Sequence, residues 1–151
     1  ILPIYEGTNA IQANDFMFRK TIRDNGKAAK ELLDEIKIDC DDNFEMSQMV
    51  TLTSKSLDYI LENRDDQEML SCISFDYLMG FGYLVGGWLM DKAKRSAKEQ
   101  LCKTSINEIF LKSKIVSAEF YDFHILPRID YHLKVVMKGA KVVQTANDSF
   151  I

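Results

Sequence analysis

Residues 73–90 read ISFDYLMGFGYLVGGWLM, and this apolar stretch decides the fold of the chain. Asp76 is its only charged residue. A helix that is apolar on almost every side is either the buried centre of a helical protein or a membrane span. The spacing Gly82-x-x-x-Gly86 also occurs where membrane helices pack together. The flanking segments have the pattern of amphipathic helices in soluble proteins, so we predict a bundle centred on this stretch and no membrane span.

Four glycines in this stretch are expected to bring neighbouring helices close to it. They are Gly80, Gly82, Gly86 and Gly87. Because glycine has no side chain, another helix can approach closely at each position. Gly80-Phe81-Gly82 could be mistaken for part of a nucleotide-binding loop, but no β-strand is predicted before it, so that signal is weak.

The rest of the chain also has the apolar spacing of helices. We predict helices over about residues 10–22, from residue 27, and over 44–63, 67–101 and 106–138. Gly26 is expected to end the first, Pro127 to kink or interrupt the last, and Gly139 to end it. The buried side of the last helix is expected to include Ile109, Phe110, Val116, Phe120, Phe123 and Tyr131. The predicted fold is all-α, an up-and-down antiparallel four-helix bundle preceded by a broken N-terminal helix.

Composition argues against several classes of function. The length of 151 residues indicates one domain. The net charge of −4 and the pI near 5.2 argue against a nucleic-acid partner. Cys40, Cys72 and Cys102 are far apart, so neither a disulfide framework nor a Cys-x-x-Cys zinc site is indicated. We predict a reducing, cytoplasmic location. The chain starts without Met inside an apolar run and has no signal-peptide pattern, so we expect a fragment of a longer protein.

No metal site is predicted. The acidic loop 39–43 lacks the glycine and the distal glutamate of a calcium loop, and we expect it to cap the next helix. His124 and His132 are too far apart in sequence to bind one metal ion together, and no Glu-x-x-His motif of a di-iron bundle is present. We interpret both histidines as packing or surface residues, and Met46 and Met49 as core residues.

The segment Tyr5-Glu6-Gly7-Thr8-Asn9 near the N-terminus is the strongest candidate for a site. Pro3 favours an extended conformation before it, and Gly7 can turn the backbone and let a ligand come close. Asn9 and Gln12 form a variant capping box, so a helix is predicted to begin near Ala10. Glu6 would then lie on a loop facing the positive end of that helix, where free N–H groups can hold an anion. The alternative is a solvated Glu6 beside an ordinary helix cap.

Residues 5–12 resemble the Tyr-Glu-Gly-Thr segment of acyl-CoA dehydrogenases, the FAD enzymes that desaturate acyl-CoA thioesters. The resemblance implies that Glu6 is the catalytic base and that Gly7 contacts the thioester substrate. It also implies that Thr8, Asn9 and Ala10 touch FAD. Residues 84–89 and 120–127, with 19–20 and 23–26, resemble a subgroup with an extra C-terminal helical domain, the 3-methylmercaptopropionyl-CoA dehydrogenase-like subgroup.

This resemblance implies two parts in the chain. Residues 1–38 would be the end of the catalytic domain, and residues 39–151 would be the C-terminal helical bundle. The implied reaction is the α,β-dehydrogenation of an acyl-CoA. Glu6 would remove the α-proton while a hydride passes to FAD, and electron-transfer flavoprotein would accept the electrons. A homodimer or homo-oligomer is implied as well. Most of the family's flavin site and acyl pocket would precede residue 1, so the isolated chain is expected to be inactive.

A second hypothesis is a non-enzymatic helical bundle that binds a partner through one of its faces. It rests on the same amphipathic helices and on the lack of a second catalytic group in the sequence after Ile36. The two hypotheses differ in what precedes Ile1. A long reading frame with an FAD-binding β-domain supports the enzyme, and a start codon close to Ile1 supports the binding module.

Overall fold

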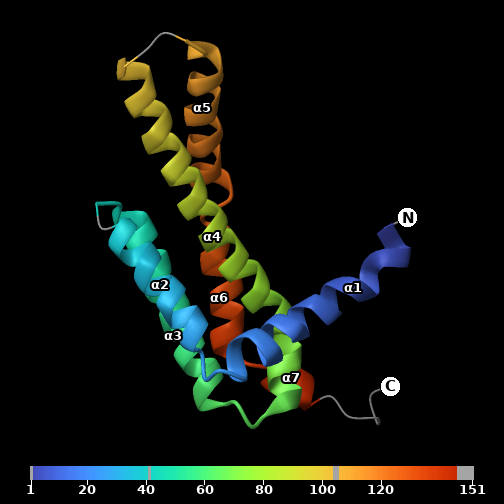
Figure 1. Ribbon diagram of the computed structural model, residues 1–151. Helices are drawn as coiled ribbons and strands as arrows, with labels where there is room; N and C mark the ends of the chain where they lie inside the picture. Colours follow the sequence, from blue (N-terminus) through green and yellow to red (C-terminus); the bar gives the residue numbers. More distant parts are fainter. Residues whose placement is uncertain (1, 41, 104–105, 146–151) are drawn as a thin grey trace.

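The computed structural model of the chain describes residues 2–40, 42–103 and 106–145. The long helices are α1 (Leu2–Asn14), α2 (Lys27–Asp39), α3 (Phe44–Glu62), α4 (Gln67–Lys103), α5 (Glu108–His124) and α6 (Arg128–Lys138) (Figure 1). A π-helical segment, η1 (Asp15–Ile22), follows α1, and a short helix, α7 (Lys141–Gln144), follows α6. Every element in these ranges is helical, which confirms the predicted all-α class.

α4 is the central helix and packs against α3, α5, α6 and the α1–η1 segment (Figure 1). Its side chains Leu70, Ile73, Tyr77 and Leu84 are almost completely buried. By length and composition alone, α4 is long and apolar enough to cross a membrane, and 44% of its most apolar window is buried inside the protein. The neighbouring helices cover the buried faces, as predicted for the centre of a bundle.

Short connections make neighbouring helices antiparallel. Residues 63–66 join α3 to α4, and the Asp66 carboxylate accepts a hydrogen bond from the Met69 N–H at 2.9 Å. Pro127 separates α5 from α6 because its ring cannot continue a helix, and the two helices lie along α4 one after the other (Figure 1). α2, α3, α4 and the α5–α6 column pack as a helical bundle, although the helix from residue 27 was predicted to belong to the broken helix that precedes the bundle. Gly139, with a φ of 64°, ends α6 as expected.

Three glycines of α4 allow the close contacts expected of them. A Cβ atom placed on Gly80 would lie 2.6 Å from Leu133 Cδ2 of α6. A Cβ atom on Gly86 would collide with the Tyr121 hydroxyl of α5. A Cβ atom on Gly87 would lie 2.7 Å from Leu126 Cδ1, in the connection between α5 and α6. A larger residue at any of these three positions would therefore force a side chain of α5, α6 or their connection to move.

The expectation of a close contact at Gly82 is wrong. A Cβ atom placed there would have nothing within 4 Å. Gly82 lies two residues beyond Gly80, and two residues correspond to about 200° around an α-helix. The position therefore faces solvent, on the side of α4 opposite α6.

The predicted start of the first helix is also wrong, because α1 begins at Leu2 and not near Ala10. The backbone of Glu6 and Gly7 therefore lies within a helix, and Asn9 does not cap a helix start. Pro3 lies in the first turn of α1, where its fixed φ suits a helix and its missing N–H is not needed. Pro3 thus begins the helix instead of marking an extended segment. The side chains of residues 2–7 are not among those that the structure describes.

The break after the first helix occurs where Gly26 predicted it. The Gly26 N–H donates to the Thr21 carbonyl at 2.8 Å, and the Asn25 N–H donates to the Ile22 carbonyl at 2.9 Å. This pair of bonds is a Schellman motif. Asn25 and Gly26 both have positive φ, 57° and 73°, so Asn25 shares the role given to Gly26. α2 starts at once, and the N-terminal helix is broken as predicted.

The buried side predicted for α5 is wrong. Leu111 and Ala118 face the core, and the residues expected there are exposed: Ile109, Phe110, Val116, Phe120 and Phe123, together with Tyr131 in α6. The prediction assumed that the most apolar stripe of a helix faces the core of its own chain. The close approach of α5 to Gly86 instead turns the stripe containing Ala118 toward α4.

Candidate functional site

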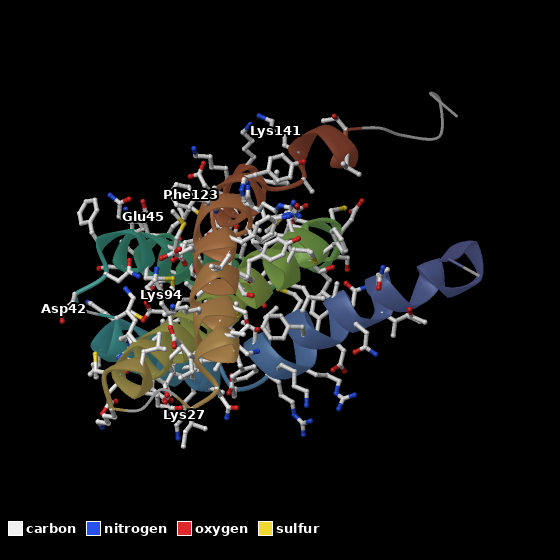
Figure 2. All side chains as sticks on the ribbon, turned by 90° about the horizontal axis from the view of Figure 1, so that it is seen from above. Lys27, Asp42, Glu45, Lys94, Phe123 and Lys141 are labelled. Atoms are coloured by element: carbon white, nitrogen blue, oxygen red, sulfur yellow. The ribbon has the colours of Figure 1, made fainter. Side chains whose placement is uncertain are left out.

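The residues predicted to form the site lie on α1, which projects away from the bundle (Figures 1 and 2). Thr8, Asn9 and Ala10 are exposed on this helix. The side chains of Glu6 and Gly7 lie outside the described residues. The structure therefore shows the backbone that carries the predicted base, and the chemical roles of residues 6–10 stay predictions.

The C-terminal end of α1 and the η1 segment that follows it pack into the bundle. Ala13 and Met17 are completely buried. The Phe16 ring lies 5.3 Å from the Tyr77 ring and 5.4 Å from the Phe81 ring, centroid to centroid. Tyr77 is so deeply buried that desolvation raises its pKa to about 12. This aromatic cluster holds the helix with Glu6 against the central helix α4.

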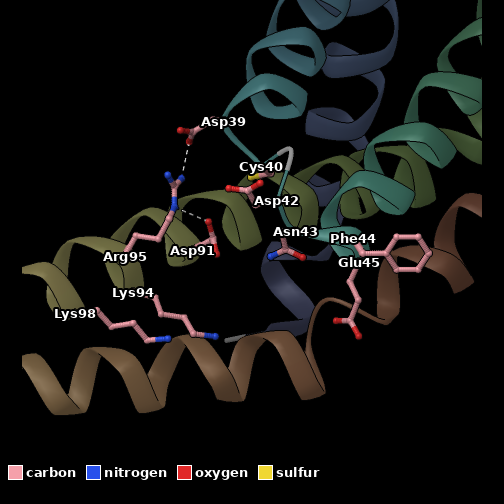
Figure 3. Close-up of a pocket in the computed structure, with 10 residues that line it drawn as sticks. All are labelled: Asp39, Cys40, Asp42, Asn43, Phe44, Glu45, Asp91, Lys94, Arg95 and Lys98. Atoms are coloured by element: carbon pink, nitrogen blue, oxygen red, sulfur yellow. Dashed lines mark hydrogen bonds and ion pairs between the residues drawn. The ribbon is translucent and has the colours of Figure 1, made fainter.

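A cavity of about 410 Å³ lies where the α2–α3 connection meets the C-terminal part of α4 (Figure 3). The connection and the start of α3 form one wall, and charged residues of α4 form the other. The lining residues are Asp39, Cys40, Asp42, Asn43, Phe44, Glu45, Asp91, Lys94, Arg95 and Lys98. Sequence reasoning identified the acidic loop of this cavity but not its basic wall, which comes from a helix about fifty residues away.

Asp39 is the centre of an ion network beside this cavity. The Trp88 indole N–H donates to Asp39 Oδ2 at 2.6 Å, and Arg95 donates to the same oxygen at 2.9 Å. Arg95 also donates to Asp91 at 2.9 Å, and the Lys92 ammonium lies 3.5 Å from Asp39. The Trp88 bond and then the Arg95 bond hold the pKa of the Asp39 carboxyl below its ordinary value. Asp39 therefore stays ionised and joins the end of α2 to α4.

Lys94, Cys40 and Asn43 of the cavity are also paired or unreactive. The Lys94 ammonium donates to Asp122 of α5 at 3.1 Å. Burial, with Asp91 and Asp39 nearby, raises the pKa of the Cys40 thiol, so the sulfur stays protonated at neutral pH. Asn43 caps α3 by accepting a hydrogen bond from the Met46 N–H at 3.2 Å, as predicted for this loop. These interactions join the helices around the cavity to one another, and none of them activates a nucleophile among the described residues.

A histidine–aspartate pair joins α4 to α6, and sequence reasoning missed the partner. His132 Nδ1 lies 2.7 Å from Asp76 Oδ1, and both side chains are largely buried. The rings of Tyr83 and Tyr131 lie 5.6 and 5.1 Å from the imidazole. The packing interpretation of His132 is confirmed. The sequence signal for this pair was Asp76, the single charged residue in the apolar stretch, because a buried carboxylate requires a partner.

His124 is exposed, with its ring against Phe120 at 4.6 Å. Among the described residues, no group of three histidine, cysteine, aspartate or glutamate side chains lies close enough together to hold a metal ion. The residues predicted to react remain those of α1.

Comparison with known proteins matches residues 24–146 to the model of a family described as acetyl-CoA dehydrogenase C-terminal like. A 3-methylmercaptopropionyl-CoA dehydrogenase of Ruegeria pomeroyi is 31% identical over 138 residues, covering 83% of this chain and 23% of that protein. The broad-specificity linear acyl-CoA dehydrogenase FadE5 of Mycobacterium tuberculosis is 29% identical over 152 residues, covering 88% of this chain and 25% of that protein. The chain thus spans about a quarter of the length of these relatives.

Proposed function

Because the chain belongs to the acetyl-CoA dehydrogenase C-terminal-like family, we propose that it is the C-terminal part of a flavin-dependent acyl-CoA dehydrogenase. The family match carries the proposal, since it covers α2 to α7 and agrees with the resemblance first noted in residues 84–89 and 120–127. The proposed reaction is the α,β-dehydrogenation of an acyl-CoA thioester. Both relatives are named as acyl-CoA dehydrogenases, which supports an acyl-CoA as the substrate.

Within that enzyme, Glu6 is proposed to take the α-proton of the thioester. A carboxylate in a site closed to water is a stronger base, because desolvation disfavours its charged form. Gly7 is proposed to contact the substrate. The support is the Tyr5-Glu6-Gly7-Thr8 motif itself, together with the packed C-terminal end of α1, which would hold this helix against the bundle.

Thr8, Asn9 and Ala10 do not make a flavin site by themselves. They are exposed on a helix that projects from the bundle. Within a helix the backbone N–H groups already donate to backbone carbonyls, so they are not free to bind a flavin. We therefore propose that these residues touch FAD only where other parts of the enzyme hold it. The isolated chain is expected neither to retain flavin nor to turn over substrate.

The helical bundle, residues 39–151, is proposed to be a scaffold and interaction domain and not a second catalytic centre. The paired charges beside the Asp39 cavity and the Asp76–His132 pair support this, because each joins two helices. Electron-transfer flavoprotein is the proposed electron acceptor, and the cytoplasm is the proposed location. The competing hypothesis, a binding module without an enzyme, is favoured only by the exposed apolar residues of α5.

The test is to determine the reading frame upstream of Ile1 and to produce its complete product. A several-hundred-residue protein that purifies with stoichiometric flavin, bleached anaerobically by an acyl-CoA, would support the proposal. A product that starts near Ile1, or a long product that neither binds flavin nor reacts with acyl-CoA, would overturn it. The 151-residue chain produced alone is the control and is expected to be colourless.

A further inference from the structure

The helix that leads from the bundle to Glu6 contains a π-helical segment of eight residues, η1. In a π-helix each backbone N–H bonds to the carbonyl five residues earlier, as the Arg23 N–H does at the end of η1, where it lies 3.1 Å from the Phe18 carbonyl. Each such turn encloses one residue more than an α-turn does. π-Helical turns inside α-helices often occur at functional sites.

The buried positions of this helix show what the π-helical bonds accomplish. Ala13, Met17 and Thr21 are completely buried and follow one another at steps of four residues. On an α-helix a buried stripe has steps of both three and four, because a turn holds 3.6 residues. Two steps of four would rotate Thr21 by about 80° away from Ala13. The wider turns of η1 keep all three side chains in the core.

The same segment contains unpaired polar groups. Among the described residues, the buried side-chain atoms without a hydrogen-bond partner are Asn14 Oδ1, Thr21 Oγ1 and the Tyr77 hydroxyl oxygen. Asn14 and Thr21 belong to this helix, and the Tyr77 ring packs on Phe16 of η1. Thr21 and Tyr77 are neighbours but form no hydrogen bond of good geometry. Because an unpaired buried polar group is unfavourable, another arrangement of this helix that pairs one of them would gain free energy.

A buried hydroxyl in an α-helix of the same protein is paired. Thr53 of α3 is as completely buried as Thr21, and its hydroxyl donates to the Met49 carbonyl, four residues earlier, at 2.7 Å. This bond is available to threonine in an α-helix. If η1 were α-helical, Thr21 could make the same bond to the Met17 carbonyl.

We propose that this helix has two registers and that η1 is the element that changes between them. The π-helical register is the one described above. In the second register η1 is α-helical, and the Thr21 hydroxyl donates to the Met17 carbonyl. The helix before Thr21 is then rotated about its own axis by on the order of 100°, the turn of one residue. The first register fills the core and the second pairs the hydroxyl, so the packed segment has two discrete arrangements.

The surroundings of the helix allow this rotation. α1 projects away from the bundle, and residues 8–12 are exposed on it (Figure 1). The contacts that have to change lie at its packed end. Ala13 is small and Met17 is unbranched, so both adapt to a changed space at little cost. Phe16 would turn within its cluster with Tyr77 and Phe81, which makes these rings reporters of the change.

The change of register would regulate the proposed catalytic base. Glu6 lies in α1, before η1, so the backbone that carries it would rotate with the helix. The base would then be turned toward the substrate in one register only. This consequence rests on the proposed function. The change of register itself does not, because it depends only on η1 and its contacts in the bundle.

NMR relaxation dispersion on the 151-residue chain is the first test. The method detects exchange on the microsecond to millisecond timescale with a minor state populated to about 0.1–10%. We expect one exchange process at the amides of residues 8–22 and at the rings of Phe16, Tyr77 and Phe81, and we expect none at the buried residues of α3. A wild-type chain without exchange in residues 8–22 would overturn the proposal.

The second test is Thr21→Val, which removes the hydroxyl that only the second register pairs. The population of that register should fall about fivefold, the effect of one buried hydrogen bond. Thr53→Val, which removes the paired hydroxyl of α3, is the matched control and should leave the exchange of residues 8–22 unchanged. Far-ultraviolet circular dichroism checks that both variants stay folded. An unchanged population in Thr21→Val would overturn the proposal.

The third test is the deletion of Lys20, an exposed residue of η1. The next buried position would then follow Met17 at a step of three, as an α-helix requires, so the exchange should disappear and the Tm should stay unchanged or rise. The control is the deletion of the exposed Lys55 in α3, where Thr53 and Leu57 already fit an α-helix, and it should lower the Tm. An equal fall in Tm for both deletions would contradict the two registers. All three tests use the chain without flavin, so they are independent of the proposed enzyme function.

Discussion

The indole N–H of Trp88 lies 2.6 Å from the Asp39 carboxylate and ties the middle of α4 to the last residue of α2. Lys92 and Arg95, one and two turns further along α4, bring positive charge to the same carboxylate. The Lys92 ammonium also lies 4.4 Å from the centre of the Trp88 ring. One aspartate at the end of α2 therefore links the α2–α3 pair to the central helix.

Replacing Asp39→Asn should lower the free energy of unfolding by about 1 kcal/mol at neutral pH. The asparagine can still accept the Trp88 hydrogen bond, but it loses the charge that attracts Arg95 and Lys92. The side chain is partly exposed, so solvent screens part of this effect. Urea denaturation measures the change. Asp130→Asn, which removes an exposed pair with Lys134 one turn away, is the control and should change stability by less than about 0.5 kcal/mol.

The effect of Asp39→Asn should depend on pH. The pKa of Asp39 is lowered in the folded state from its ordinary 3.8. The carboxylate therefore stabilises the fold above that ordinary value, and this contribution disappears as the pH falls through the lowered pKa. The stability difference between wild type and Asp39→Asn should be full at pH 7 and should decrease as the pH falls below 3.8 toward the lowered pKa. A difference that grew on acidification would contradict the assigned ion network.

Gly80→Ala and Gly82→Ala should have opposite effects on stability, although both lie in the same helix. A methyl group on Gly80 would meet Leu133 at 2.6 Å, so we expect a loss of about 1–3 kcal/mol from overpacking. A methyl group on Gly82 meets nothing within 4 Å, so its greater helix propensity should stabilise the protein by about 0.5–1 kcal/mol. Thermal unfolding followed by circular dichroism compares the two. Equal effects would show that α6 does not pack on Gly80.

Tyr77→Phe and Tyr121→Phe should also differ. The Tyr77 hydroxyl is buried beside the Thr21 side chain but makes no hydrogen bond of good geometry among the described residues, so its removal should be nearly neutral. The Tyr121 hydroxyl donates to the Tyr83 carbonyl at 3.0 Å, so its loss should cost about 1 kcal/mol. Denaturant unfolding at neutral pH gives both values. A large loss in Tyr77→Phe would reveal an ordered partner at its hydroxyl.

Tyr77 should also make the protein sensitive to alkaline pH. Burial raises its pKa from 10 to about 12, so the unfolded chain loses this proton at a lower pH than the folded chain does. The stability that depends on the protonated hydroxyl is complete below pH 10 and is lost as the pH rises toward about 12. Tyr77→Phe should therefore lose less stability over this range than wild type, as measured by urea denaturation.

In the complete enzyme that we propose, Glu6→Gln should lower the rate of flavin reduction by about 10²–10⁴, because it removes the base that takes the α-proton. Glutamine preserves the size of the side chain, so acyl-CoA binding and flavin content should remain. Anaerobic stopped-flow reduction by an acyl-CoA, with flavin content measured first, gives the rates. Glu31→Gln, at an exposed position on α2, is the control. Similar rates in Glu6→Gln and wild type would remove Glu6 from the mechanism.

Much of the fold could be predicted from local sequence signals. The apolar stretch 73–90 marked the central helix, and Gly26, Pro127 and Gly139 marked where helices end. Each of these residues acts through the conformation of its own backbone, so its effect does not depend on distant parts of the chain. Pro3 was misread because proline is compatible both with an extended segment and with the first turn of a helix.

Contacts between distant residues could not be predicted in this way. His132 and Asp76 are 56 positions apart, and Trp88 and Asp39 are 49 apart. The sequence contained a solitary Asp76 in an apolar helix, but several polar residues could have been its partner. The cavity at Asp39 was unpredictable for the same reason, since its basic wall belongs to α4. The motif at residues 5–12 indicated a chemistry, but not a complete site.

The sequence by itself determined the helical class, the places where helices break and the family motif, because helix periodicity and backbone preferences act over a few residues. Only the tertiary structure decided which side of each helix is covered. α5 carries two apolar stripes, and the sequence does not show which of them faces the core. The close approach of Gly86 in α4 to Tyr121 in α5 buries the stripe of Leu111 and Ala118 and leaves the larger side chains of the opposite stripe, Ile109, Val116, Phe120 and Phe123, in solvent.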